Sequence, residues 1–287
     1  MAATNETSNP ERNRGWYKED VTEINAPMHE LLEKYSKVPS NEVVTHVNNI
    51  RAKGFRANPY PCIGLYRFTI LTLLTHPRYP EIVSRLKAPG AAYLDIGCCF
   101  GQDLRRLVHD GVPSENLVGL DIEAPLMELG KDLFLDGATL RSRFVVADVF
   151  QGASQGEAWT QLLSEPPAST AGGGFDVIHC SAFFHLFPLP DQIVAAKQIA
   201  PLLKKDGLLV GRQGGSVRPG NLPAIDEGSF SYRHDVSTLT AMWDEVGAAT
   251  GTGWEVTGSL DMVGMNPDSP VENADSRRLL FTITRVR

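Results

Sequence analysis

The sequence predicts a doubly wound α/β domain built on a mostly parallel sheet. From Ala91 onward, short apolar segments typical of strands alternate with segments typical of helices. One apolar run ends at Asp95 and opens into a turn of small residues before a helical segment. A second run, Leu117 to Leu120, ends at another acid, Asp121. Strands that end in this way are typical of sheets that hold a nucleoside-bearing cofactor at their carboxyl ends.

Strands and helices are expected to alternate through this domain. The expected strands are 91–96, 116–121, 143–147, 174–179, 207–212, 254–260 and 278–285. The expected helices are 101–110, 124–135, 157–164, 190–203 and 236–247. No helix separates the last two strands, so we expect a hairpin whose final strand is antiparallel to the rest of the sheet. Residues 213–235 are expected to form a long connection, and a connection of that length is often functional.

The N-terminal part lacks this alternation. Residues 1–15 are polar and are predicted to be a disordered tail. Residues 16–89 are predicted to form a helical cap, in which Ser40 is the N-cap of one helix, 66–74 is a second, apolar helix, and Pro80 lies in the first turn of a third. Residues 90–287 then form the cofactor-binding domain.

Composition excludes several classes of protein. The formal net charge is −7, so no overall basic field favours a nucleic-acid partner. The four cysteines, at positions 62, 98, 99 and 180, have no C-x-x-C spacing, which favours reduced thiols inside the cell. The polar N-terminus has no signal-peptide core, and no apolar run is long enough to cross a membrane. We therefore expect a cytoplasmic protein without a membrane span, and no metal site.

The turn after the first strand decides which cofactor the domain binds. A dinucleotide-binding turn needs glycines at positions 97, 99 and 102, and this chain has Gly97, Cys99 and Gln102. The pattern acid-x-G-x-G-x-G matches at Asp95, Gly97 and Gly101, with Cys99 in place of the middle glycine. That pattern is the S-adenosyl-L-methionine loop of class I methyltransferases. The alternative is an ordinary tight turn between a strand and a helix.

Acids at the ends of the next two strands complete the predicted cofactor site. Asp121 can accept hydrogen bonds from both ribose hydroxyls, or it can cap the following helix. Asp148 lies where a carboxylate can accept from the purine amine, or it can form a turn. The full set of predicted cofactor-binding residues is Tyr66, Asp95, Gly97, Cys98, Gly101, Asp121, Ile122, Asp148, Val149 and Ser181.

The end of the fourth strand should face the methyl acceptor, because ligands bind beyond the carboxyl ends of such strands. His179 is predicted to be a core residue. His185 is the candidate catalytic residue, as a general base or a hydrogen-bond donor to the substrate; the alternative is helix packing. The aromatic residues that could line an apolar pocket are Phe183, Phe184, Phe187 and Phe230, with core packing as their alternative.

Four segments resemble one family. Trp16-Tyr17, Ile63–Phe68, Tyr93–Arg105 and Phe183–Phe187 are similar to the fungal methyltransferases of meroterpenoid biosynthesis, of the austinol, terretonin and andrastin type, in which Cys98-Cys99 is usual. The resemblance implies a Rossmann-like class I fold, with a seven-stranded sheet and added N-terminal helices. The implied cofactor is S-adenosyl-L-methionine. The implied reaction is methylation of the carboxyl group of a farnesylated aromatic polyketide acid, and a homodimer is expected.

In similar enzymes the N-terminal helices fold over the cofactor, so Tyr66 would contact the methionine carboxylate. A carboxylate acceptor is already ionised at neutral pH and needs no general base. Basic groups should orient it, and the candidates are Arg67, His185, Arg212 and His234. A surface ion pair is the alternative for each arginine. The competing functions are methylation of another small molecule at oxygen or carbon, a nucleotide-binding oxidoreductase, and a catalytically silent binding protein.

Overall fold

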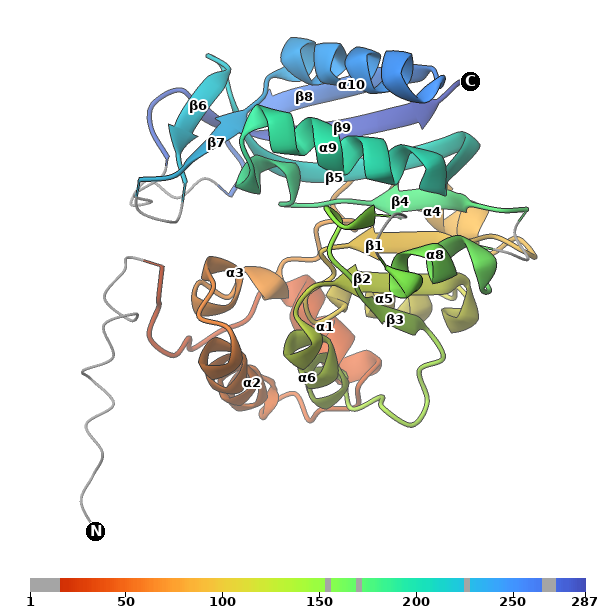
Figure 1. Cartoon of the computed structure of the whole chain (residues 1–287). Coiled ribbons are helices and arrows are strands. Elements are labelled where there is room, and N and C mark those ends of the chain that lie inside the picture. Colours follow the sequence, from red (N-terminus) through yellow and green to blue (C-terminus); the bar gives the residue numbers. More distant parts are fainter. Residues whose placement is uncertain (1–15, 153–155, 169–171, 225–227, 265–271) are drawn as a thin grey trace.

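A computed structural model describes residues 16–152, 156–168, 172–224, 228–264 and 272–287. Its centre is a seven-stranded sheet in the order β3-β2-β1-β4-β5-β9-β8 (Figure 1). The predicted disordered tail, 1–15, lies outside the described residues. The strands are β1 (Tyr93–Ile96), β2 (Leu117–Asp121), β3 (Arg143–Val146), β4 (Phe175–His179), β5 (Leu203–Ser216), β8 (Trp254–Asp261) and β9 (Ser276–Arg285).

The predicted hairpin at the end of the chain is confirmed. β1 to β5 are mutually parallel, whereas β9 is antiparallel to both β5 and β8. β9 inserts between β5 and β8, so the last strand of the chain is not at the sheet edge. The strand order reverses beside β1, and the carboxyl ends of β1, β2 and β4 therefore border one crevice.

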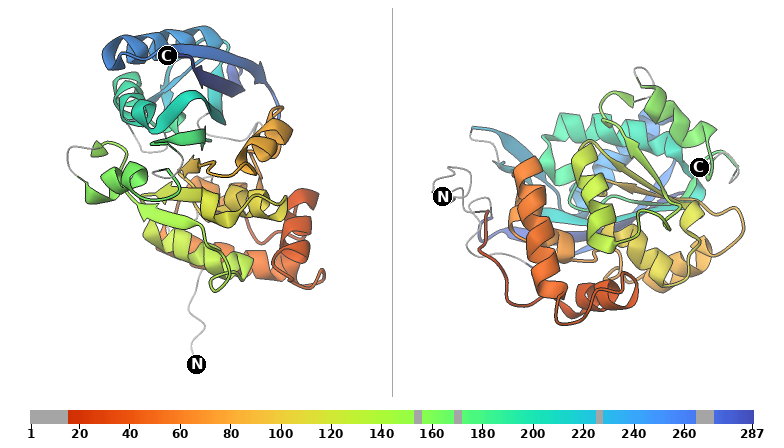
Figure 2. Two further views of the ribbon diagram at one scale, coloured as in Figure 1. Left: turned by 90° about the vertical axis from the view of Figure 1, so that its right-hand side faces the viewer. Right: turned by 90° about the horizontal axis from the view of Figure 1, so that it is seen from below.

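The two faces of the sheet carry different helices (Figures 1 and 2). One face packs against α8 (Glu157–Ser164), α9 (Leu189–Ile199) and α10 (Val236–Thr250). The other face packs against α4 (Tyr79–Leu86) and α5 (Gln102–His109). Side chains alternate along β1 as a strand requires: Tyr93 belongs to the second cluster, and Leu94 and Ile96 belong to the first.

The N-terminal helices form a third cluster on the cofactor-loop side of the sheet. α1 (Ala26–Lys34) and α2 (Val43–Ala57) pack with α6 (Ala124–Phe134), and α2 lies beside α6 in Figure 1. The short α3 (Pro61–Gly64) and the 3-10 turn η3 (Arg67–Thr69) follow. The ring of Phe68 meets that of Phe100 edge-on at 4.8 Å between centroids, so this helical part contacts the predicted cofactor loop directly.

Two predictions for this helical part are wrong, and one is confirmed. Residues 66–74 form no regular helix, because Tyr66 adopts a left-handed backbone conformation (φ 57°) and only η3 follows it. Ser40 caps no helix, because it lies in a turn before α2, whose N-cap position is Glu42. Pro80 does lie in the first turn of α4.

The predicted long connection after the fifth strand is also wrong in part. β5 continues to Ser216 because its extension pairs with β9 through Ser276–Leu280. Beyond it, β6 (Gly220–Pro223) and β7 (Phe230–Arg233) form a separate antiparallel hairpin. The predicted helix 190–203 ends at Ile199, followed by a 3-10 turn (η6, Ala200–Leu202). Within the described residues, no helix is both long and apolar enough to cross a membrane.

A fully buried ion pair joins α5 to the segment after α6. Arg105 donates from Nε and Nη2 to the two carboxylate oxygens of Asp136, at 2.9 and 3.0 Å. Its Nη1 donates to the carbonyl oxygen of Phe100, at 2.9 Å. The hydroxyl of Tyr35, just after α1, donates to the same Asp136 at 2.8 Å. Arg105 and Asp136 together thus connect the cofactor loop and α5 to the segments that follow α6 and α1.

We predict that Asp136→Ala lowers the free energy of unfolding by about 3–5 kcal/mol, because it leaves the Arg105 guanidinium buried without a counter-ion. Chemical denaturation measures this change. The matched control is Glu128→Ala, which removes an ion pair with Lys131 on the surface of α6 and should change stability by about 1 kcal/mol or less. Equal changes in the free energy of unfolding for the two substitutions would contradict a stabilising role of the buried pair between Arg105 and Asp136.

Candidate active site

The turn between β1 and α5 presents backbone to the crevice. Gly97, Cys99 and Gly101 all have positive φ, at 74°, 55° and 68°. Gly97 is exposed, and a Cβ there would meet only a ring carbon of Phe183, 3.5 Å away. The backbone at Gly97 therefore stays open to close approach by a ligand. A Cβ at Gly101 would instead lie 2.4 Å from Nη1 of Arg105, so this glycine is required by the buried ion pair.

The cysteine pair in this turn is buried and unreactive. Cys98 packs against β2, where a Cβ on Gly119 would lie 2.9 Å from its sulfur. Burial raises the pKa of the Cys98 thiol well above its ordinary value. A hydrogen bond with Cys62 and burial do the same for Cys99. Both thiols are therefore protonated at neutral pH, and neither is suited to nucleophilic chemistry.

Asp121, at the end of β2, is held by backbone. Its carboxylate accepts from the N–H of Cys99 at 2.7 Å and from the N–H of Glu123 at 3.0 Å. Burial raises its pKa, partly opposed by these two hydrogen bonds. The N-cap alternative is wrong, because the cap position of α6 is Glu123. Next to it, the apolar side chain of Ile122 is 60% exposed, so an apolar surface lies beside a fixed carboxylate.

The other predicted cofactor residues lie at the ends of β3 and β4. Asp148 accepts from the N–H of Phe150 at 2.9 Å, so the turn-forming role is real, and Val149 behind it is buried. Ser181 donates from its hydroxyl to the carbonyl oxygen of Arg212 at 2.9 Å. Tyr66 lies within the helical part of the chain. Its hydroxyl donates to Asn48 at 2.7 Å and accepts from Nε of Arg51 at 2.8 Å.

Aromatic side chains gather at the same edge. Phe187 meets Phe183 and Phe150 edge-on, with centroid distances of 5.3 and 4.9 Å. Sequence reasoning did not select Phe150. Its position two residues after Asp148, the acid that follows the third strand, could have indicated that it lies at the site. Phe230, on β7, is 56% exposed. Phe184 is instead fully buried against Trp243, in the core.

Positive charge is concentrated around His185. Burial lowers its pKa well below the ordinary value, and the charges of Arg233, Arg278 and Arg67 lower it further. We call these four residues, together with Glu272, the arginine cluster. Nη1 of Arg233 donates to the carbonyl oxygen of His185. Glu272 pairs with Nη2 of Arg278 at 2.7 Å, and both are nearly buried.

The charges within the arginine cluster act on one another. Burial lowers the pKa of Arg67, and Arg278 lowers it further while Glu272 opposes the shift. Burial also lowers the pKa of Arg233 to about 10. Among the described residues, Nδ1 of His185 is buried without a hydrogen-bond partner. The cluster therefore holds three guanidinium groups, one carboxylate and a neutral imidazole, an arrangement suited to binding an anion.

Two of the predicted substrate-binding groups lie outside the arginine cluster. Arg212 donates to Asp261 at 3.3 Å and to the carbonyl oxygen of Val263, near the end of β8. His234 is buried and shares a hydrogen bond with Thr238 at 3.0 Å, and burial lowers its pKa to about 4. Sequence reasoning missed Arg233 and Arg278, because their proximity to Arg67 depends on the β6–β7 hairpin and β9.

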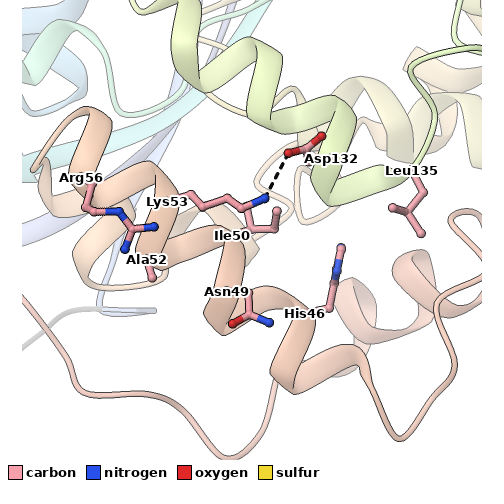
Figure 3. A pocket seen from close by; sticks show the side chains of 8 residues that line it. All are labelled: His46, Asn49, Ile50, Ala52, Lys53, Arg56, Asp132 and Leu135. Carbon is pink, nitrogen blue, oxygen red and sulfur yellow. Dashed lines mark hydrogen bonds and ion pairs between the residues drawn. The ribbon is translucent and has the colours of Figure 1, made fainter. Parts of the chain in front are cut away.

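A hollow of about 570 Å³ lies elsewhere, between α2 and the C-terminal half of α6 (Figure 3). Its lining includes His46, Lys53 and Arg56 from α2, with Asp132 and Leu135 from the other side. Nζ of Lys53 pairs with Asp132 at 3.4 Å. None of the predicted site residues lines this hollow, so it is separate from the crevice at the strand ends.

Comparison with known proteins places the chain in a family. The family described as "Meroterpenoid methyltransferase N-terminal domain" matches residues 16–69, and that described as "Methyltransferase domain" matches residues 94–209. O-methyltransferase phiE, from a fungal species, is 39% identical over 94% of this chain and 92% of its own length. Asnovolin E/Chermesin D methyltransferase nvfJ of Aspergillus novofumigatus is 40% identical over 80% of this chain and 79% of its own.

Among solved structures, magnesium protoporphyrin IX methyltransferase of Synechocystis with bound S-adenosylmethionine is 13% identical over 92% of this chain and 99% of its own, with a TM-score of 0.43. The strand order and the sequence relatives define the fold. This chain is a methyltransferase that uses S-adenosyl-L-methionine. It belongs to the fungal meroterpenoid methyltransferase family. The oxidoreductase alternative is therefore wrong.

The residues at the crevice fit this cofactor. The open backbone at Gly97 leaves room for a group that approaches the loop closely. Two backbone N–H groups fix the orientation of the Asp121 carboxylate. A carboxylate fixed in this way can accept hydrogen bonds from the two hydroxyls of a ribose. The exposed side chain of Ile122 offers an apolar surface where a purine ring could lie.

Proposed function

We propose that this enzyme methylates the carboxyl group of a prenylated aromatic polyketide acid, giving a methyl ester, in fungal secondary metabolism. The observation that carries the proposal is the arginine cluster, since it combines three guanidinium groups with a histidine that stays neutral. The match to a meroterpenoid methyltransferase family supports the class of substrate.

The cofactor would be held by the residues predicted from the sequence. The backbone from Gly97 to Gly101 would face its methionine part, and Asp121 its ribose, with Ile122, Asp148 and Val149 around the purine. Ser181 and Tyr66 would close the two sides, and residues 16–89 would act as a cap. Bound there, S-adenosyl-L-methionine supplies a methyl group activated by a sulfonium.

The acceptor needs orientation more than activation. A carboxyl group has a reference pKa of about 4, so it is ionised at neutral pH without a base. Arg67 and Arg233 would hold one of its oxygens, and His185 could donate one further hydrogen bond. Phe150, Phe183, Phe187 and Phe230 would contact the apolar part of the substrate and exclude water from the reacting atoms. A homodimer in the cytoplasm stays a prediction.

We predict that Asp121→Asn weakens binding of S-adenosyl-L-methionine at least tenfold, because the amide loses the charge and cannot accept from both backbone N–H groups at once. Titration calorimetry measures the affinity, and thermal melting confirms the fold. Asp132→Asn, an exposed substitution on α6, is the matched control and should leave the affinity unchanged. Unchanged binding by Asp121→Asn would remove this residue from the cofactor site.

We predict that Arg67→Met raises KM for the acid substrate about tenfold or more, because the substitution removes one charge from the arginine cluster. The uncharged primary amide of the same acid should bind Arg67→Met and the unsubstituted enzyme equally well. Arg85→Met, which alters a surface arginine paired with Glu81, is the control. Equal losses for the acid and its amide would mean that Arg67 acts on shape or stability and not on charge.

We predict a flat profile of kcat/KM between about pH 7 and 9 at saturating cofactor. The acid is already ionised in this range, and His185, whose pKa is well below its ordinary value, remains neutral. Acid binding should fall toward pH 10, where Arg233 begins to lose its proton. His185→Asn should lower kcat less than about tenfold. A kcat/KM that rises tenfold per pH unit, abolished by His185→Asn, would indicate a phenol acceptor and a general base.

A further inference from the structure

Beneath the cofactor loop, four side chains form a continuous hydrogen-bonded chain. His179, at the end of β4, bonds through Nδ1 to Oδ1 of Asp95 at 2.9 Å. Its Nε2 lies 3.3 Å from the hydroxyl of Thr72, which donates to Oδ2 of Asp103 at 3.1 Å. The other oxygen of Asp103 accepts from the N–H of Leu73 at 3.1 Å. Asp95, Asp103 and His179 are 3%, 1% and 2% exposed.

Charge balance makes His179 the cation of this chain. Burial disfavours its charged form, but the neighbouring Asp95 and Asp103 outweigh burial and raise the pKa of His179. Burial raises the pKa of Asp103 to about 6, opposed by His179. In its charged form, His179 donates from both ring nitrogens, to Asp95 and to Thr72, while Thr72 donates to Asp103. Every polar hydrogen in this chain then has an acceptor.

The chain joins the parts of the protein that must meet during the reaction. Asp95 lies two residues before Gly97, and Asp103 lies in the first turn of α5, on the other side of the cofactor loop. His179 pairs with Asp95 across neighbouring parallel strands and lies two residues before Ser181. Thr72 and Leu73 belong to the N-terminal helical part.

We propose that His179 is a positioning residue that holds the two ends of the cofactor loop against the N-terminal cap. Its positive charge offsets the repulsion between the carboxylates of Asp95 and Asp103. The hydrogen bonds of Thr72 with His179 and Asp103 then connect this group to the cap. The proposal rests on the cofactor assignment and not on the identity of the acceptor acid. Without the imidazolium, two buried carboxylates would repel one another and the loop would open.

The three ionisable side chains lie within 4.8 Å of one another, a spacing that would also suit a metal ion. However, both nitrogens of His179 and both oxygens of Asp103 are engaged in the hydrogen bonds above. The arrangement is therefore complete as an ion pair with a hydroxyl bridge. Other titratable groups act on it from the elements packed around it. They are His76, from the segment before α4, Tyr93, from β1, Asp121, from β2, and the thiols of Cys98 and Cys180.

The test is titration calorimetry of the full chain with S-adenosylhomocysteine, the product form of the cofactor, between pH 6 and 8.5. We expect the unsubstituted protein to keep its affinity under conditions in which His179→Asn has lost it. His179→Asn should bind at least tenfold more weakly at pH 8 and should recover as the pH falls, because Asp103 then takes up the proton that the imidazolium had supplied. Adding Asp103→Asn to His179→Asn should restore binding to within about threefold at every pH.

A second pair of variants covers the outcome in which His179→Asn does not fold. Thr72→Val keeps the shape of the side chain and removes the bridging hydroxyl, and it should weaken binding about threefold to fivefold. Thr75→Val makes the same change at an exposed position in the same segment and should have no effect. The proposal is overturned if Thr72→Val binds as the unsubstituted protein does, or if the weakening in His179→Asn is independent of both pH and Asp103. Because the assay contains no acceptor acid, its outcome is independent of the proposed function.

Discussion

The structure depends on the buried guanidinium of Arg105. This group is fully enclosed, and its charge is matched by Asp136 through two parallel hydrogen bonds. It also lies about 5 Å from the ring centres of Phe134 and Phe144. Nη1 donates to the carbonyl oxygen of Phe100, which lies between Cys99 and Gly101. The guanidinium therefore fixes the orientation of the Phe100–Gly101 peptide group. The positive φ angles at Gly97, Cys99 and Gly101 are stable because contacts such as this one hold the backbone in that conformation.

The candidate site next to this ion pair has two halves of opposite charge. Under and beside the cofactor loop lie three carboxylates, Asp95, Asp103 and Asp121, with His179 as their only described positive partner in hydrogen-bond contact. The arginine cluster, which includes His185 in the turn just beyond β4, holds three positive charges against Glu272. The proposed reaction joins a sulfonium donor and a carboxylate acceptor, whose charges are opposite to those of these two halves. In that reaction each reactant would be attracted to its own half and repelled from the other.

The sequence predicted those parts of the structure that depend on neighbouring residues. The tight turn between β1 and α5, the second strand that ends at Asp121 and the terminal hairpin are each encoded within one short segment, and the structure confirms all three. The apolar helix expected over 66–74 was wrong because the hydroxyl of Tyr66 bonds Asn48 and Arg51 on α2, and its backbone turns away to make that contact. Tertiary contacts override local propensity in such cases.

The acceptor side shows the limit of sequence reasoning most clearly. Arg67 was predicted to act on the acid, and the structure surrounds it with arginines from β7 and β9, about 166 and 211 positions later in the chain. His234 was chosen, whereas its neighbour Arg233 is the residue that belongs to the arginine cluster, since adjacent residues of an extended segment point to opposite sides. A cluster whose members lie this far apart carries no local pattern, and only the pairing of β5 with β9 and the β6–β7 hairpin brings it together. Under the proposed function, selectivity for the acceptor could therefore change through either hairpin while the loop between β1 and α5, which Arg105 contacts through the carbonyl oxygen of Phe100, stays as it is.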